Sequence, residues 1–175
     1  MTTNPTNPSG EPLRSLPETT QHHHELMMPH IDALPALAET IDTVRPEAFA
    51  ARFEVEYRFI HDQMLPHIDA VERRIYPELE RLLQNRHSMI PMRHEHRELR
   101  RLIAALGDYR PGVAAGSLDE GEAMGLRRVL YRLHAMYKVH LAEEEHYLAV
   151  LEGSLSPEER DALAQSLDHA MAQPI

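Results

Sequence analysis

The chain has 175 residues, with 28 acidic and 18 basic side chains, 13 histidines and no cysteine or tryptophan. This length corresponds to one domain with tails, and the formal net charge of −10 argues against nucleic-acid binding, which needs a clustered basic surface. Because cysteine is absent, disulfides and thiolate metal sites are excluded. Any bound metal must be held by imidazole and carboxylate groups, which suit iron, manganese or zinc.

The first twenty residues hold four of the 13 prolines, together with Thr, Ser, Asn and Gly, and this composition predicts a disordered tail over 1–20. They lack the basic patch and apolar stretch of a signal peptide. No apolar run in the chain approaches the about 20 residues that span a bilayer. We therefore expect a cytoplasmic protein with no membrane or nucleic-acid partner.

The remaining sequence predicts helix throughout. Residues 11–106 contain no glycine, and apolar residues recur at spacings of three and four, without the alternation that is typical of strands. The pattern predicts four long amphipathic helices, over about 22–44, 47–85, 88–106 and 119–152. The segment Ser156-Pro157-Glu158-Glu159 predicts the start of a fifth helix over about 157–171, because it combines an N-cap, a proline at the first position and early carboxylates.

Long helices joined by short connections predict an all-α fold, an antiparallel up-down four-helix bundle with a short C-terminal fifth helix on its outside. The expected divisions are a tail over 1–20, the bundle over 21–153, and the short helix with its tail over 154–175. Four prolines inside the helices are expected to kink them: Pro29, Pro35, Pro66 and Pro77. An alternative interpretation begins the first helix at Pro29 and leaves the histidines at 22–24 in the tail.

A helix advances about 100° per residue, so each histidine can be placed relative to the apolar stripe of its own helix. This placement directs at least one histidine inwards from each of the four long helices: His23 and His30 from the first, His67 at the border of the second stripe, His96 from the third and His140 from the fourth. In the first helix, His22 and His24 fall on either side of the stripe.

Glu144 is the least expected inward residue, one turn after His140 on the same face of the fourth helix. Burial of an unpaired carboxylate is costly, so Glu144 must be neutralised, exposed or bound to a cation. A single inward histidine is more often a hydrogen-bonded core residue than a ligand. Histidines from four helices that converge with a carboxylate favour a metal site, to which Glu145 offers a second carboxylate at a wider angle.

The second helix lacks a matching carboxylate, because the position one turn after His67 is Val71. Glu72 is the nearest carboxylate, about 140° around the helix from His67. Glu78 is a further candidate along the same helix.

Four segments of the chain together resemble the hemerythrin-like (HHE cation-binding) family: HHHELMMPHIDAL, LPHIDAVERRIYPEL, MRHEHRELRRLIAAL and VHLAEEEHYLAVLEG. Their order and spacing cover about 22–152. The resemblance implies an up-down four-helix bundle with a non-haem di-iron centre built from histidines and carboxylates. The ligands that it implies are His30 (or His23 or His24), His67, His96, His140 and Glu144.

The sequence departs from the family pattern at Val71, where the second helix of the family carries a bridging glutamate, and Glu72 is the expected substitute. Ala149-Val150 also replaces the aromatic-proline pair of the family's fourth helix. Because a bridging carboxylate is missing, four alternatives for the site stay open. They are two irons with a weaker second position, a mononuclear site, another divalent metal, or no metal.

The resemblance implies a protein that binds or senses O2, peroxide, NO or iron, because two Fe(II) ions supply two electrons together. A ligand set rich in histidine and poor in carboxylate favours binding or sensing over enzymatic oxygen activation. Two alternatives stay open. One is a non-haem iron oxidoreductase, with peroxide, O2 or an organic substrate beside Val71. The other is a metal-free helical interaction module.

Overall fold

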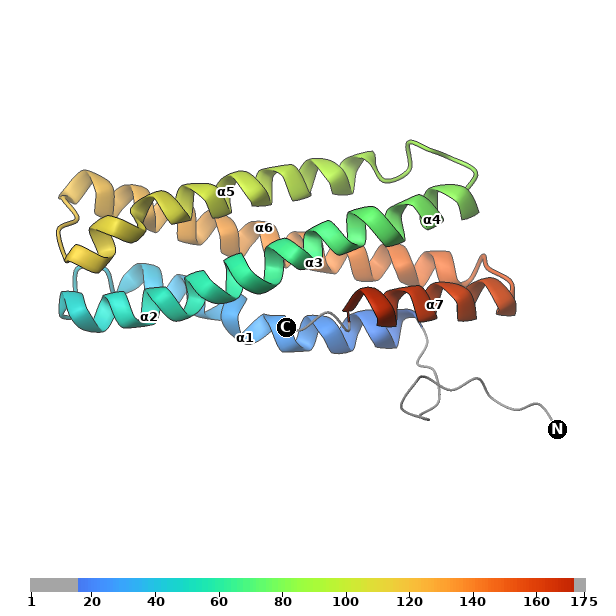
Figure 1. Ribbon diagram of the computed structural model, residues 1–175, viewed down its shortest axis with the longest axis horizontal. Helices are drawn as coiled ribbons and strands as arrows, with labels where there is room; N and C mark the ends of the chain where they lie inside the picture. The colour runs from blue at the N-terminus through green and yellow to red at the C-terminus, as the bar shows by residue number, and fades with distance from the viewer. Residues whose placement is uncertain (1–15, 172–175) are drawn as a thin grey trace.

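The computed structural model describes residues 16–171, and these form helices that run side by side, with no strand among them (Figure 1). In chain order, the elements are α1 (Leu16–Glu39), α2 (Pro46–Phe59), the π-helical turn η1 (Ile60–Met64), α3 (Leu65–Ala70), the second π-helical turn η2 (Val71–Ile75), α4 (Tyr76–Leu82), α5 (Ile90–Ala115), α6 (Glu120–Glu152) and α7 (Pro157–Met171). The all-α class expected from the sequence is confirmed for this part of the chain.

Helix α1 begins at Leu16, inside the segment that the sequence analysis assigned to the tail. Thr20 is fully buried, so the first turns of the helix are packed against the rest of the protein. The alternative start at Pro29 is wrong, because this proline and Pro35 lie within one continuous helix. The expected tail over 1–15 and the last four residues, 172–175, lie outside the described part of the chain.

The second long helix is one helical run over 46–82 that is interrupted by two π-helical turns. Each turn directly precedes a proline: the Leu65 N–H donates to the Ile60 carbonyl just before Pro66, and the Tyr76 N–H donates to the Val71 carbonyl just before Pro77. Proline has no N–H, and its ring crowds the preceding turn, which a wider turn relieves. The disturbance expected at these prolines therefore takes the form of π turns.

Helix α5 continues past its expected end at Gly107 and stops at Gly116, whose φ of 62° is left-handed and suits glycine at a helix end. The connection between the third and fourth long helices is therefore shorter than expected, and it covers residues 116–119. Asp119 then begins α6 with a reciprocal cap, in which its carboxylate accepts from the Glu122 N–H and the Glu122 carboxylate accepts from the Asp119 N–H.

The long helices enclose a common interior: α1 packs on α6, α6 on α5, α5 on α2, and α2 on α1 (Figure 1). Helix α7 packs against α1, α3 and η2, and it buries Leu163 and Ala164. The expected fifth helix is therefore present, and it packs against the side of the four long helices and adds these two residues to an apolar cluster. Within residues 16–171, no helix has the length and apolar character of a membrane span.

The apolar core is divided in two. The larger cluster includes Met27, Leu99 and Leu141, and the smaller includes Val71 and Leu148. Six buried or half-buried polar side chains of α1, α3, α5 and α6 lie near or between the residues of these two clusters. They are His23, His24, His67, His96, His140 and Glu144. The interior thus contains a polar layer between two apolar ones.

Candidate metal centre

The polar layer, which we call the histidine layer, consists of His23 and His24 of α1, His67 of α3, His96 of α5, and His140 and Glu144 of α6. All but His67 are buried, and the most exposed of these, His23, shows only 6 % of its surface. Two adjacent histidines of α1 are buried together because this helix packs against both α6 and α7. One of them, His24, is expected from the helical spacing to lie beside the apolar stripe, and in the structure it is buried.

Carboxylates hold three of these rings by their Nδ1 atoms. The contacts are His24 to Glu145 Oε1 at 2.8 Å, His96 to Glu72 Oε1 at 2.9 Å, and His140 to Glu95 Oε2 at 2.8 Å. A carboxylate accepts a hydrogen bond, so Nδ1 carries the proton and Nε2 of a neutral ring keeps its lone pair. Metal-binding histidines in proteins almost always have such a partner, which fixes the tautomer and the orientation of the ring.

The Nε2 atoms of His96 and His140 lie 3.0 Å apart. If both rings were neutral with Nδ1 protonated, two lone pairs would face each other, and a shared proton or a metal cation removes this repulsion. Two donors at right angles around a metal, with bonds of about 2.1 Å, are themselves about 3 Å apart. The separation of the two nitrogens therefore fits neighbouring ligands of one ion.

A second pair of imidazoles lies in the same layer. His23 Nε2 is 3.1 Å from His67 Nδ1, and the two rings stack with centroids 4.7 Å apart. His67 Nε2 is enclosed and has no hydrogen-bond partner. A buried polar atom without a partner is costly, and a metal ion would satisfy this nitrogen.

Glu144 provides the negative charge of the layer. Its Oε2 lies 3.3 Å from His24 Nε2. Burial alone would raise the pKa of this carboxyl group, but the hydrogen bond from His24 and the charges of His140, His24 and His67 outweigh burial and lower it. Glu144 is therefore ionised at neutral pH, and a cation in the layer would have a compensating charge.

Most of the imidazoles are neutral at physiological pH. Burial lowers the pKa of His23 and His96 to about 4 and that of His67 to about 3. For His24, the hydrogen bonds and charges of Glu144 and Glu145 outweigh burial and raise the pKa. Neutral rings offer lone pairs to a metal without first losing a proton.

Two residues predicted as ligands do not join the layer directly. His30 donates to Glu56 Oε2 at 2.8 Å and stacks on Phe59, and its side chain is 33 % exposed. Along α1, His30 is about 10 Å from His23. The inward position here is that of Ile31, so the helical-wheel placement of His30 is wrong by one residue. Glu72 does not contact His67 but accepts from both His96 and Arg100.

Sequence reasoning missed two residues of the centre, Glu95 and Tyr76. Glu95 precedes His96 and reaches across to His140 on α6, so its only sequence signal is a carboxylate beside an inward histidine. The Tyr76 hydroxyl lies 3.3 Å from His96 Nε2, and its fully buried ring is parallel to that of His96. Its sequence signal is the Tyr76-Pro77 pair at the end of the second motif.

The donor set fits a metal chemically, although in residues 16–171 no three His, Asp or Glu side chains already surround one point. The pair formed by His96 and His140 brings two ring nitrogens to about the separation of neighbouring ligands. Neutral imidazoles with an ionised carboxylate suit Fe(II), Mn(II) or Zn(II), and the unsatisfied His67 Nε2 requires a partner.

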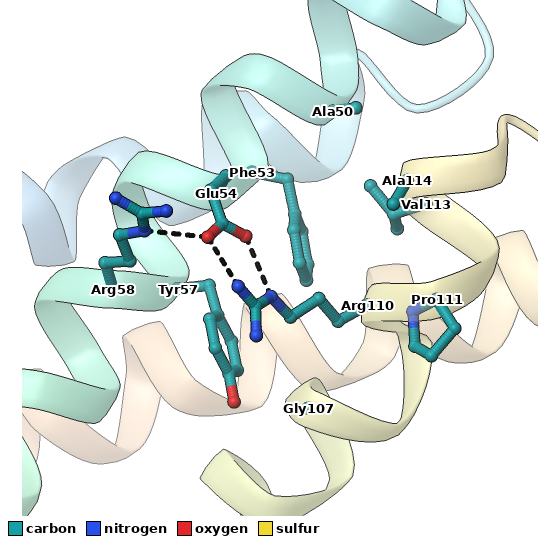
Figure 2. A pocket seen from close by; sticks show the side chains of 10 residues that line it. All are labelled: Ala50, Phe53, Glu54, Tyr57, Arg58, Gly107, Arg110, Pro111, Val113 and Ala114. Atoms are coloured by element: carbon teal, nitrogen blue, oxygen red, sulfur yellow. Dashed lines mark hydrogen bonds and ion pairs between the residues drawn. The ribbon is translucent and has the colours of Figure 1, made fainter.

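A surface cavity of about 710 Å³ lies between α2 and α5, and none of its lining residues belongs to the histidine layer (Figure 2). Within it, the Glu54 carboxylate accepts hydrogen bonds from Arg58 and Arg110, and the Arg110 guanidinium lies 4.9 Å above the Tyr57 ring (Figure 2). These bonds lower the pKa of Glu54 to about 2. Both cations are thus paired with an acid of the same cavity.

Comparison with known proteins bears on the same residues. The family model described as hemerythrin HHE cation binding domain matches residues 15–151, which span α1 to α6 almost completely and include the whole histidine layer. No curated protein and no solved structure matches the chain. Because the match covers most of the sequence, the chain belongs to the hemerythrin HHE cation-binding domain family.

Proposed function

We propose that this protein is a non-haem iron protein that binds or senses a small ligand, O2, peroxide or NO, at a two-iron centre inside an antiparallel up-down four-helix bundle. The observation that carries the proposal is the histidine layer: buried or half-buried imidazoles from four helical runs, three of them held at Nδ1 by a carboxylate. We propose a cytoplasmic location, as expected from the sequence.

The two imidazole pairs suggest how two ions would be held. His96 and His140 would hold one iron, and His67 with His23 or His24 would hold the other. Glu144 influences the pKa values of His23, His24, His67 and His96 through its charge, which places it within electrostatic reach of both pairs. Iron would supply electrons and open coordination positions for the small ligand.

The chain itself keeps the centre ready for a cation. The carboxylates of Glu72 and Glu95 hold His96 and His140 in the tautomer that presents Nε2, and apolar clusters lie on both sides of the layer. Among the residues that the structure describes, Glu144 is the one carboxylate buried with the imidazoles. This neutral, histidine-rich set supports ligand binding or sensing over oxidation of an organic substrate.

A metal-free interaction module is the second candidate, because no three His, Asp or Glu donors of the described residues already converge. The two functions differ in iron content. If the protein is an iron protein, anaerobic loading with Fe(II) gives close to two irons per chain, and exposure to air gives the near-ultraviolet absorption of an oxo-bridged ferric pair. A protein that stays iron-free under this treatment supports the module.

His140 provides the test of the ligand assignment. We expect His140→Ala to lose bound iron with little change in helical content, because its ring contributes a donor at the centre and α6 packs through many apolar side chains. Metal analysis and circular dichroism measure the two effects. His146→Ala, which changes an exposed histidine of the same helix, is the control and keeps its iron. Unchanged iron in His140→Ala would refute the assignment.

A further inference from the structure

We propose that Tyr76 is a metal ligand of this centre and that its phenolic oxygen replaces the carboxylate missing at Val71. This inference rests on the proposed iron function and adds a donor to it. Among the described residues, no three His, Asp or Glu side chains form a group that could hold a metal ion. Tyrosine is not one of these residue types, so it can add a donor. With it, the pair formed by His96 and His140 becomes a set of three donors.

The contacts of Tyr76 place its oxygen at the imidazole pair. The hydroxyl is 3.3 Å from His96 Nε2, the same nitrogen that lies 3.0 Å from His140 Nε2. His96 Nδ1 is already engaged by Glu72, so Nε2 is the atom that remains for a cation. Both separations are close to the about 3 Å expected between neighbouring ligands of one ion.

The second π turn explains how a residue five positions after Val71 reaches the vacant ligand position. In an α-helix, residues five apart are about 140° apart around the axis. Here the Tyr76 N–H donates to the Val71 carbonyl, five residues earlier, which is the hydrogen bond of a π-helix. Such a turn rotates the following residues back, so Tyr76 is buried in the same apolar cluster as Val71.

Burial and the charges of Glu144, Glu72 and Glu95 raise the pKa of the Tyr76 hydroxyl, so the phenol keeps its proton unless a cation binds it. The side chain is 1 % exposed, and the Arg93 guanidinium lies 5.3 Å above its ring. With Fe(III) in the centre, Tyr76 would hold it through its phenolate oxygen, and the phenol proton would pass to solvent with no change in the oxidation state of the iron. The phenolate then contributes the negative charge that a glutamate at position 71 would have supplied.

The experiment uses the full chain loaded with Fe(II) and oxidised in air. A phenolate bound to Fe(III) gives a charge-transfer absorption in the visible region and tyrosinate vibrations in the resonance Raman spectrum. We expect these signals in the unmodified protein, their loss in Tyr76→Phe, and their retention in Tyr137→Phe. Tyr137 is a matched control, because it is equally buried but belongs to the larger apolar cluster.

The outcomes separate the inference from the proposed function. If iron binds but the visible signals are absent, or if they persist in Tyr76→Phe, the Tyr76 assignment is overturned and the iron function stands. If the unmodified chain binds no iron, both are overturned. If Tyr76→Phe loses its helical circular dichroism, the double variant Tyr57→Phe/Tyr137→Phe decides: retained signals support Tyr76, and lost signals overturn it.

Discussion

Each imidazole of the histidine layer is useful to a metal only in one tautomer and one orientation. For His140, both are fixed by Glu95 of the neighbouring helix α5, whose carboxylate accepts from Nδ1. The hydrogen bond from His140 is the main reason that the pKa of Glu95 is lowered, so the acceptor is charged at neutral pH. Glu95, which would not itself contact a metal, thus controls how the His140 ring is presented to one.

We expect Glu95→Gln to weaken iron binding by about 10- to 100-fold, the usual effect of changing the partner of a ligating histidine. An anaerobic Fe(II) titration against a competing chelator measures the affinity. Glu98→Gln is the control, because Glu98 lies one turn further along α5 and pairs with Arg101 and Arg132 on the surface. Equal affinities for the two variants would show that Glu95 does not support the centre.

At the scale of the elements, the positions where the helices widen or end decide which residues face the interior. The two π turns in the run over 46–82 change the rotational register after Ile60 and again after Val71. At the other end of the molecule, Gly116 ends α5 and contacts Pro46 at the start of α2, since a Cβ there would lie 3.0 Å from the Pro46 Cβ. This helix end therefore requires glycine for both its conformation and its contact.

Gly116→Ala is expected to lower the free energy of unfolding by about 1–2 kcal/mol, because the left-handed φ and the close approach to Pro46 both disfavour a side chain. Denaturant unfolding measures the change. Gly153→Ala is the matched control at the end of α6, where φ is −65° and the added Cβ would make only an ordinary contact. A loss of the same size in both variants would contradict this explanation.

At the scale of the whole molecule, the folded structure holds three histidines of the polar layer in their neutral form. His23, His67 and His96 have pKa values of about 4, 3 and 4 in the folded protein, against 6.5 for an ordinary histidine. Below about pH 6.5, the unfolded chain therefore binds more protons at these positions than the folded chain does. His24 has the opposite sign, because its pKa is raised and its contribution is lost as pH rises.

We expect the metal-free protein to become less stable as pH falls from about 6.5 towards 4, by about 1.4 kcal/mol per pH unit for each net proton. Three histidines have lowered pKa values and only His24 of this layer has a raised one, so the net effect of lower pH is a loss of stability. Thermal unfolding of chelator-treated protein at pH 7.5 and pH 5 gives the comparison, and the melting temperature should be lower at pH 5. His67→Gln should reduce this difference, and an unchanged melting temperature in the unmodified protein would contradict the expectation.

The helical class, the family and the arrival of a histidine from each long helix follow from the sequence alone, because apolar spacing and donor identity are local properties of the chain. The sequence also located Glu144 one turn after His140. The tertiary structure decided that His24 lies inside and His30 at the boundary, since the inward face of α1 depends on which helices pack against it. It also brought Glu95 and Tyr76 to the centre, because an interhelical contact and the rotation of a π turn are not part of a regular helical pattern.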